Sequence, residues 1–276
     1  MKAALIACSD GLSPRAAATL DGVLDALRAL GLEAFCAGPL SAPVGACAAP
    51  AKERAEALNA LLRQGDAAFL FDVSGGDSAN ELLPLIDWEA AAHSRAVLCG
   101  YSDLTCLLNA FHAQTRRPCV LWQARWLCGG AAGAQRAYLA RALAGAWGPF
   151  SAQLVRGNAM KGALIGGNAR CLLKLAGTPY WPDVSGRVLL LEGMSGGEAR
   201  VRALFAQLAQ TGAFAAAAGV VLGTFTQLDA ECGPDAAVRI ALDYLPAATP
   251  LARTREIGHG EASRAAVLGA PLALRA

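Results

Sequence analysis

Short apolar runs of strand length alternate with amphipathic helical segments through the first half of this chain, and this alternation constrains the fold most. The apolar runs lie at residues 3–7, 67–71, 96–99 and 119–121. Leucines at helical spacing mark a helix that Ser13 and Pro14 open and Gly31 ends, and a second helix at 51–64. Strands that are apolar on both faces belong in parallel sheets covered by helices on both sides. The first half is therefore predicted to be an α/β domain.

The second half of the chain has a different character. From Val155 onward, glycines punctuate apolar strands such as residues 162–167 and 187–192. The predicted organisation is an N-terminal domain over residues 1–127, an Ala- and Gly-rich linker over 128–154, and a smaller, β-rich α+β domain over 155–276.

Composition excludes several functional classes for this chain of 276 residues. The formal charge is +2 and no block of Lys or Arg stands out, so a nucleic-acid partner is not expected. Nine cysteines without a CxxC pair indicate reduced thiols and a cytoplasmic protein. The first apolar run is too short for a signal peptide. Residues 203–228 are uncharged, but internal glutamines and Gly212 divide them into a helix and a buried strand, so no membrane span is expected.

A serine follows the strand at residues 96–99. That strand ends at Gly100, and a helix-compatible run starts at Leu104, so Ser102 lies on a sharp strand-to-helix turn. Such a turn exposes the hydroxyl at the carboxyl edge of a sheet and aims the first helical amides at the atom attacked. The usual glycine two residues after the serine is replaced by Leu104, so a serine that merely caps the helix is the alternative.

A serine nucleophile needs a base, and the chain offers three histidines. His112 lies ten residues further along the same helix, roughly 15 Å away, and cannot reach back. His93 belongs to a polar helical segment typical of a surface. His259 stands between two glycines in a loop, where the backbone can approach a ligand closely. His259 is therefore the candidate base, and a solvated loop histidine is the alternative.

The base needs an orienting carboxylate. Glu192 ends the apolar run 188–191, at the carboxyl end of a predicted buried strand where α/β proteins gather their ligands. A buried acid at that position requires a partner, and an imidazole is suitable. Asp103 and Glu261 are rival orienting residues, and a glutamate that simply reaches solvent is the alternative.

Hydrolysis of an acyl bond also requires donors for the oxyanion. The amide of Asp103 supplies one, and the turn Ser74-Gly75-Gly76-Asp77 after an apolar strand can supply another from Gly76 or Asp77. Glycine turns also hold phosphates, but this one fits neither nucleotide-binding pattern. No motif for a metal ion is present, and no cofactor is expected.

Several segments together resemble the LD-carboxypeptidases and their microcin-immunity relatives, the S66 serine peptidases. The matching segments are residues 74–87, 100–105, 166–168, 176–179, 189–192 and 258–260. The resemblance implies a Ser102-Glu192-His259 triad, a flavodoxin-like N-terminal domain and a homodimer. It also implies a peptide substrate, with release of terminal D-alanine from murein tetrapeptide in the cytosol and no cofactor.

The sequence departs from that family around the substrate cleft. Asp77 replaces an aromatic residue, Ser74 replaces an arginine, Gly193 replaces an acid, and Trp122-Gln123-Ala124 replaces a His-Gly-Pro segment. The missing arginine at Ser74 and the Ser78-Ala79-Asn80 stretch favour the microcin-immunity branch, which cleaves peptidyl or aminoacyl nucleotide amides. Two further hypotheses are a thiol enzyme using Cys99 or Cys106 and a catalytically silent binding protein.

Three arginines are candidates to grip a substrate carboxylate: Arg125, Arg156 and Arg253. Each also fits an ordinary surface position.

Overall fold

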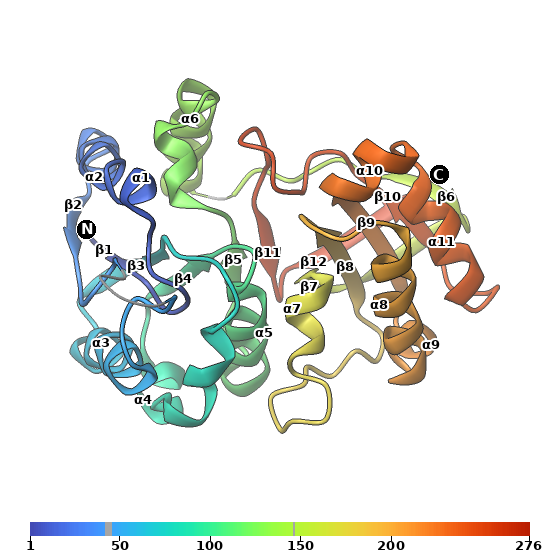
Figure 1. The fold of residues 1–276 in the computed structure, drawn as a ribbon, viewed down its shortest axis with the longest axis horizontal. Coiled ribbons are helices and arrows are strands. Elements are labelled where there is room, and N and C mark those ends of the chain that lie inside the picture. Colours follow the sequence, from blue (N-terminus) through green and yellow to red (C-terminus); the bar gives the residue numbers. More distant parts are fainter. Residues whose placement is uncertain (42–45, 146) are drawn as a thin grey trace.

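The computed structural model describes residues 1–41, 46–145 and 147–276. Within these residues the strands form two six-stranded sheets that lie side by side (Figure 1).

The first sheet has flavodoxin-like topology. Its strands are β1 (Lys2–Ile6), β2 (Glu33–Cys36), β3 (Ala67–Asp72), β4 (Val97–Gly100), β5 (Cys119–Leu121) and β11 (Ala266–Leu268). The order is β2-β1-β3-β4-β5-β11, with the first five strands parallel and β11 antiparallel to β5. The strand order 2-1-3-4-5 places ligands at the carboxyl ends of the strands. The predicted α/β class and flavodoxin-like sheet are confirmed.

Helices cover both faces of this sheet, which explains the uninterrupted apolar strands. They are α1 (Pro14–Ala17), α2 (Leu20–Ala29), α3 (Ala51–Gln64), α4 (Trp88–His93), α5 (Leu104–Thr115) and α6 (Ala132–Leu143), with the 3₁₀ helices η1 (Ala79–Leu85) and η2 (Ala124–Cys128). Figure 1 shows α2 and α6 on one side of the sheet and α3, α4 and α5 on the other.

The single helix expected after Ser13 is divided into α1 and α2. Ser13 caps α1 as predicted, because its hydroxyl accepts the Ala16 amide at 3.3 Å. The Thr19 hydroxyl donates to the Ala16 carbonyl at 2.7 Å, a local hydrogen bond that competes with the helical ladder. The helical hydrogen bonding is interrupted at residues 18 and 19, and α2 begins at Leu20.

The second sheet has a parallel centre and antiparallel edges. Its strands are β6 (Gln153–Arg156), β7 (Ala159–Asn168), β8 (Val188–Gly193), β9 (Gly219–Phe225), β10 (Leu251–Arg253) and β12 (Pro271–Arg275). Strands β7 to β10 are parallel, and β12 and β6 pair with them in antiparallel fashion. The accompanying helices are α7 (Ala169–Leu173), α8 (Glu198–Gln210), α9 (Ala213–Ala216), α10 (Thr226–Cys232) and α11 (Ala236–Tyr244).

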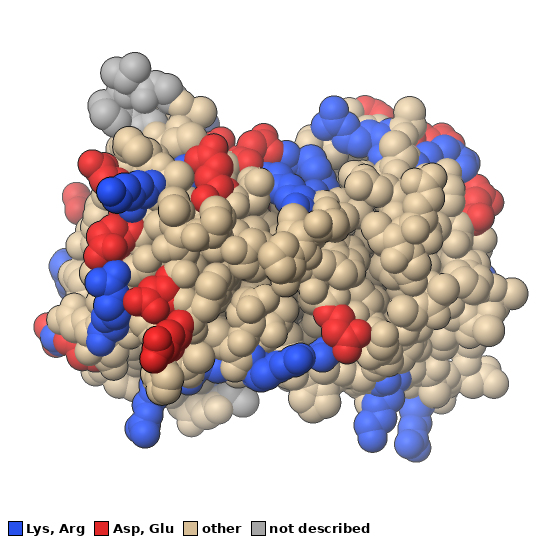
Figure 2. All heavy atoms as spheres, turned by 90° about the horizontal axis from the view of Figure 1, so that it is seen from below, with Lys and Arg blue, Asp and Glu red and all other residues tan. Residues whose placement is uncertain are grey.

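The uncharged segment 203–228 divides between helices and β9, as its polar residues indicate. Among the described residues, no helix is long and apolar enough to cross a membrane. Figure 2 shows basic and acidic side chains interspersed over one face of the molecule, in keeping with the small net charge.

Polar side chains of α5 fix the second sheet against the first. Asn109 accepts the Gly166 amide at 2.8 Å and donates to the Gly166 carbonyl at 2.9 Å. One turn earlier, the Thr105 hydroxyl accepts the Asn168 amide at 3.0 Å. Asn109, Thr105 and Asn168 are buried, and a buried backbone donor or acceptor without a hydrogen-bond partner would lower the stability of the fold. Each of these hydrogen bonds supplies such a partner. The N-terminus of α5 is thereby held beside the carboxyl ends of β7 and β8.

Candidate active site

Ser102 occupies a strained turn between β4 and α5. Its φ is +58°, a left-handed conformation that residues other than glycine rarely adopt. Its carbonyl accepts the Thr105 amide at 3.0 Å, so the turn leads directly into the helix. Strain of this kind marks the nucleophile turn of many hydrolases, because it lifts the hydroxyl above the sheet.

His259 and Glu192 lie in line with Ser102. The Ser102 Oγ is 3.1 Å from His259 Nε2, and His259 Nδ1 is 2.7 Å from Glu192 Oε2. Glu192 is fully buried near the end of β8, and the His259 side chain is 11% exposed. A buried carboxylate of this kind requires a partner, which the imidazole supplies. The structure therefore brings together the three side chains that the sequence singled out.

Tyr101 covers the imidazole from the first sheet. Its ring packs edge-on against His259 at a centroid distance of 5.0 Å. Burial, followed by the negative charge of Glu192, holds the pKa of the Tyr101 phenol well above its ordinary value. Tyr101 is therefore a neutral wall that shields the imidazole from solvent.

A close backbone approach positions the histidine loop. The Thr224 amide, in β9, donates to the Ile257 carbonyl at 2.8 Å, and the Gly258 amide donates to Ser263 Oγ at 3.1 Å. A Cβ at Gly258 would overlap Thr224 Oγ1. Only glycine fits between the loop and the strand, which accounts for the first glycine of Gly258-His259-Gly260.

The two rival orienting acids have other partners. Asp103 is buried and accepts hydrogen bonds from Ser9 Oγ at 2.6 Å and the Ala79 amide at 2.9 Å, and it pairs with Lys174. Glu261 accepts the Gly130 amide. Of the three acids proposed, Glu192 is the one paired with His259.

The glycine turn after β3 faces the serine. Gly76 has φ +132°, and a Cβ there would overlap the Asp10 carboxylate, so this turn requires glycine. Gly76, Asp77 and Ser102 line one cavity. Asp103 is the residue before α5, and within the described residues its amide donates no hydrogen bond to the protein. The amides of Gly76, Asp77 and Asp103 therefore stay candidates for binding the oxyanion.

Two cations near the glycine turn escaped the sequence analysis. Arg170 donates to the Gly76 carbonyl at 3.2 Å and pairs with Asp77. Lys174 donates to the Asp77 carbonyl at 2.7 Å and pairs with Asp103. Both come from the second half of the chain. The sequence did contain a signal for them. Arg170 and Lys174 are four residues apart and follow Gly166-Gly167-Asn168 closely, a spacing that places two side chains on one face of a helix.

Two cavities flank the catalytic line. One, of about 180 Å³, is bordered by Ser102 and Glu192 and has an apolar wall that includes Val201, Leu204 and Phe225. The other, of about 570 Å³, is bordered by His259, Gln123 and Arg125. Ser102 borders the first cavity and His259 borders the second, so the hydrogen-bonded pair lies between them.

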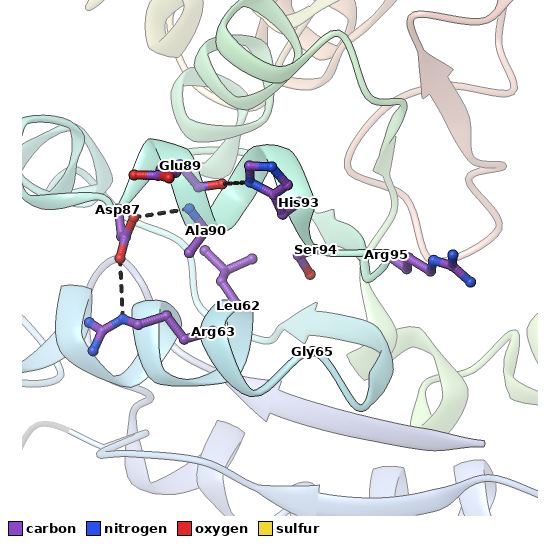
Figure 3. A pocket seen from close by; sticks show the side chains of 9 residues that line it. All are labelled: Leu62, Arg63, Gly65, Asp87, Glu89, Ala90, His93, Ser94 and Arg95. Carbon is purple, nitrogen blue, oxygen red and sulfur yellow. Dashed lines mark hydrogen bonds and ion pairs between the residues drawn. The ribbon is translucent and has the colours of Figure 1, made fainter.

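The other histidines lie away from this site. His112 is packed at the end of α5, and its Nδ1 is 2.8 Å from the Arg117 carbonyl. His93 borders a surface cavity between α3 and α4, where its Nδ1 lies 2.8 Å from the Glu89 carbonyl (Figure 3). Both placements agree with their exclusion as the base.

The thiols of Cys99 and Cys106 are buried, and burial raises the pKa of both well above the ordinary value. Neither provides a reactive thiolate. In the described parts of the chain, no cluster of three His, Cys, Asp or Glu side chains is arranged to hold a metal ion.

Comparison with known proteins places this architecture in a family. A model of the LD-carboxypeptidase N-terminal domain matches residues 3–121, and a model of the C-terminal domain matches residues 161–274. The murein tetrapeptide carboxypeptidase of Pseudomonas aeruginosa is 28% identical over 260 residues, covering 89% of this chain and 85% of that protein.

A relative from Vibrio cholerae named as a carboxypeptidase is 26% identical over 215 residues, which cover 64% of this chain. The match spans 63% of that relative's length, less than two thirds. The structure of the microcin C7 self-immunity protein MccF (Escherichia coli) in complex with glutamyl sulfamoyl guanosine has the same fold. Its TM-score is 0.88 at 19% identity, covering 99% of this chain and 92% of MccF. The chain belongs to the LD-carboxypeptidase family, the S66 peptidases.

Proposed function

We propose that this protein is a serine peptidase that hydrolyses an amide bond through Ser102, His259 and Glu192. The observation that carries the proposal is the continuous line of the three side chains, with separations of 3.1 and 2.7 Å, ending at a serine with φ +58°. A nucleophile, a base and a buried orienting acid at hydrogen-bond distances are the arrangement that activates a serine.

The geometry supports a two-step mechanism. Glu192 keeps the proton on His259 Nδ1, so Nε2 is free to take the Ser102 proton as Oγ attacks the carbonyl carbon. The amides of Asp103 and of Gly76 or Asp77 stabilise the oxyanion. His259 then gives the proton to the leaving amine, and a water molecule hydrolyses the acyl-enzyme with the same histidine as base.

The substrate we assign first is a murein tetrapeptide, with release of its terminal D-alanine. The Pseudomonas aeruginosa relative, named a murein tetrapeptide carboxypeptidase, aligns over most of both chains and supports this assignment. The cavity of about 180 Å³ beside Ser102 lies below the usual range for drug-sized ligands and suits a small peptide group.

A second candidate is hydrolysis of an aminoacyl-nucleotide amide. The supporting observation is the similarity to MccF, whose structure was determined with glutamyl sulfamoyl guanosine. The replacement of an arginine by Ser74 and the Ser78-Ala79-Asn80 stretch also favour this candidate.

The cytoplasmic location and the homodimer stay predictions. All nine cysteines are free thiols, and several are fully buried, which supports a reducing compartment.

The test of the triad compares wild type with Ser102→Ala, using Ser185→Ala as a control for an exposed serine on a distant loop. Each protein is incubated with murein tetrapeptide or an aminoacyl-sulfamoyl nucleotide, and products are analysed by mass spectrometry. We expect Ser102→Ala to lower turnover by about 10⁴-fold or more, with Ser185→Ala unchanged.

The substrates separate the hypotheses. Loss of D-alanine release in Ser102→Ala supports the carboxypeptidase, whereas cleavage of the nucleotide alone moves the protein to the second candidate. Turnover that survives Ser102→Ala contradicts the triad. Absence of turnover by wild type on both substrates favours a catalytically silent binding protein.

A further inference from the structure

The structure separates the three arginines that the sequence offered as carboxylate clamps. Arg156 donates to the backbone carbonyls of Thr249 and Pro246, and Arg253 pairs with Asp235. Arg125 instead borders the cavity of about 570 Å³ that also reaches His259.

Arg125 is a half-buried cation that lacks a carboxylate partner. It lies on η2, directly after β5, and among the described residues no carboxylate oxygen comes within 4.0 Å of its guanidinium. Its Nε is buried and makes no hydrogen bond. Burial lowers the pKa of Arg125 and the more distant negative charge of Asp72 opposes this in part, while the arginine stays charged at neutral pH. A desolvated, unpaired cation is unfavourable, and an anion from a ligand would relieve that cost.

The other charged groups in this cavity leave the Arg125 site open to an anion. Glu261 is directed to the Gly130 amide, and Arg15 is an exposed cation at the rim. The side-chain oxygen of Gln123 accepts a hydrogen bond from the Arg125 backbone amide at 3.2 Å, which fixes the backbone that carries the guanidinium.

The chemistry of the leaving group points to the same cavity. His259 delivers its proton to the leaving amine, so the departing residue lies on the histidine side of Ser102. When that residue is the last of a peptide, its carboxylate is one carbon from the amine. The carboxylate therefore enters the cavity that His259 shares with Arg125.

We propose that Arg125 binds the free α-carboxylate of the leaving residue and so restricts hydrolysis to the terminal amide bond. This inference rests on the proposed function. The guanidinium fork matches a carboxylate with two parallel hydrogen bonds, which a terminal carboxamide does not reproduce.

The test compares murein tetrapeptide with its C-terminal carboxamide. Binding of both to Ser102→Ala and to Ser102→Ala/Arg125→Gln is measured by calorimetry, and turnover of both is measured with wild type and Arg125→Gln. Arg170→Gln, which changes an arginine in the opposite cavity, is the matched control, and thermal unfolding verifies that each variant is folded.

We expect the free acid to bind roughly 10- to 100-fold more tightly than the carboxamide, and Arg125→Gln to abolish most of this preference. Arg170→Gln should leave the ratio of acid to carboxamide unchanged, whatever its effect on the overall rate. Arg125→Lys should restore only part of the preference, because it lacks the planar fork.

Equal binding of acid and carboxamide to Ser102→Ala overturns the proposal, as does a preference that persists in Arg125→Gln. Because these results come from binding, they decide the role of Arg125 even if wild type turns over only the nucleotide conjugate. That last outcome counts against the murein assignment instead.

Discussion

At the scale of single residues, Ser102 shows how the surroundings hold a residue in a conformation that it would otherwise avoid. A left-handed serine costs of order 1 kcal/mol or more, and it persists only when neighbouring contacts fix the backbone. Here the next residue, Asp103, is buried and held by Ser9, the Ala79 amide and Lys174. The nucleophile turn is thus secured by groups from both halves of the chain.

His112 carries a pH-dependent part of the stability. Burial, together with the charges of Arg187 and Arg116, lowers its pKa, while the hydrogen bond to the Arg117 carbonyl opposes this in part. The unfolded chain binds a proton below about pH 6.5, and the folded protein does so only at lower pH. Stability is therefore expected to fall as the pH drops below about 6.5.

His112→Asn tests this expectation, because its amide can still donate to the Arg117 carbonyl. Urea unfolding at pH 5, 6, 7 and 8 should show a smaller loss of stability toward acid in the variant than in wild type. Parallel pH profiles for the two proteins would contradict the assignment to His112.

At the scale of elements, the position of His259 depends on how its loop packs against β9. Gly258→Ala would drive a methyl group into Thr224 and displace the imidazole from Ser102. We expect kcat to fall by about 10²-fold, since a displacement of about 1 Å has that effect on catalysis. The free energy of unfolding should change much less, because the loop can shift outward.

A second substitution makes this prediction specific. In the Gly258→Ala background, Thr224→Ala removes the hydroxyl and the γ-methyl group, and only the Thr224 Cβ, 3.0 Å from the added methyl, remains. The double variant should regain part of kcat in a steady-state assay. If Thr224→Ala gives no recovery, the loss has another cause than this contact.

At the scale of the whole molecule, the chain returns to the first sheet after building the second. Strand β11 pairs Ala266 with Leu121 and Leu268 with Cys119, so it covers the edge of β5. The division of the chain into domains over residues 1–127 and 155–276 stays a prediction. Strand β11 lies in the second of these ranges but belongs to the first sheet. The loop that carries His259 lies between β10 of one sheet and β11 of the other, which places the base over the serine.

This arrangement predicts that residues 1–154 do not fold as stably as the whole chain. Without β11, the buried strand β5 becomes an open edge, a template for aggregation. We expect the fragment to unfold at a lower temperature by calorimetry and to gain solubility when refolded with residues 155–276. A fragment that melts at the temperature of the intact protein would show that β11 contributes nothing to the first sheet.

Local patterns in the sequence were sufficient for several features. Apolar runs bounded by glycine predicted the parallel strands, and the Gly100–Ser102–Leu104 spacing predicted the serine turn, because both depend on neighbours along the chain. The single helix predicted between Ser13 and Gly31 was wrong at residues 18 and 19, where no glycine or proline marks the break between α1 and α2.

The sequence by itself determined the α/β class, most of the parallel strands and the residues fit to be a nucleophile, a base and an acid. It did so because periodicity and residue chemistry are local properties. The residue pattern left Asp103 and Glu261 as rivals of Glu192, and the tertiary structure shows that Glu192 is the acid that meets His259. Only the tertiary structure shows that Arg125 shares a cavity with that histidine. Those choices depend on how two sheets dock through α5 and β11, contacts between residues far apart in the chain that no local pattern contains.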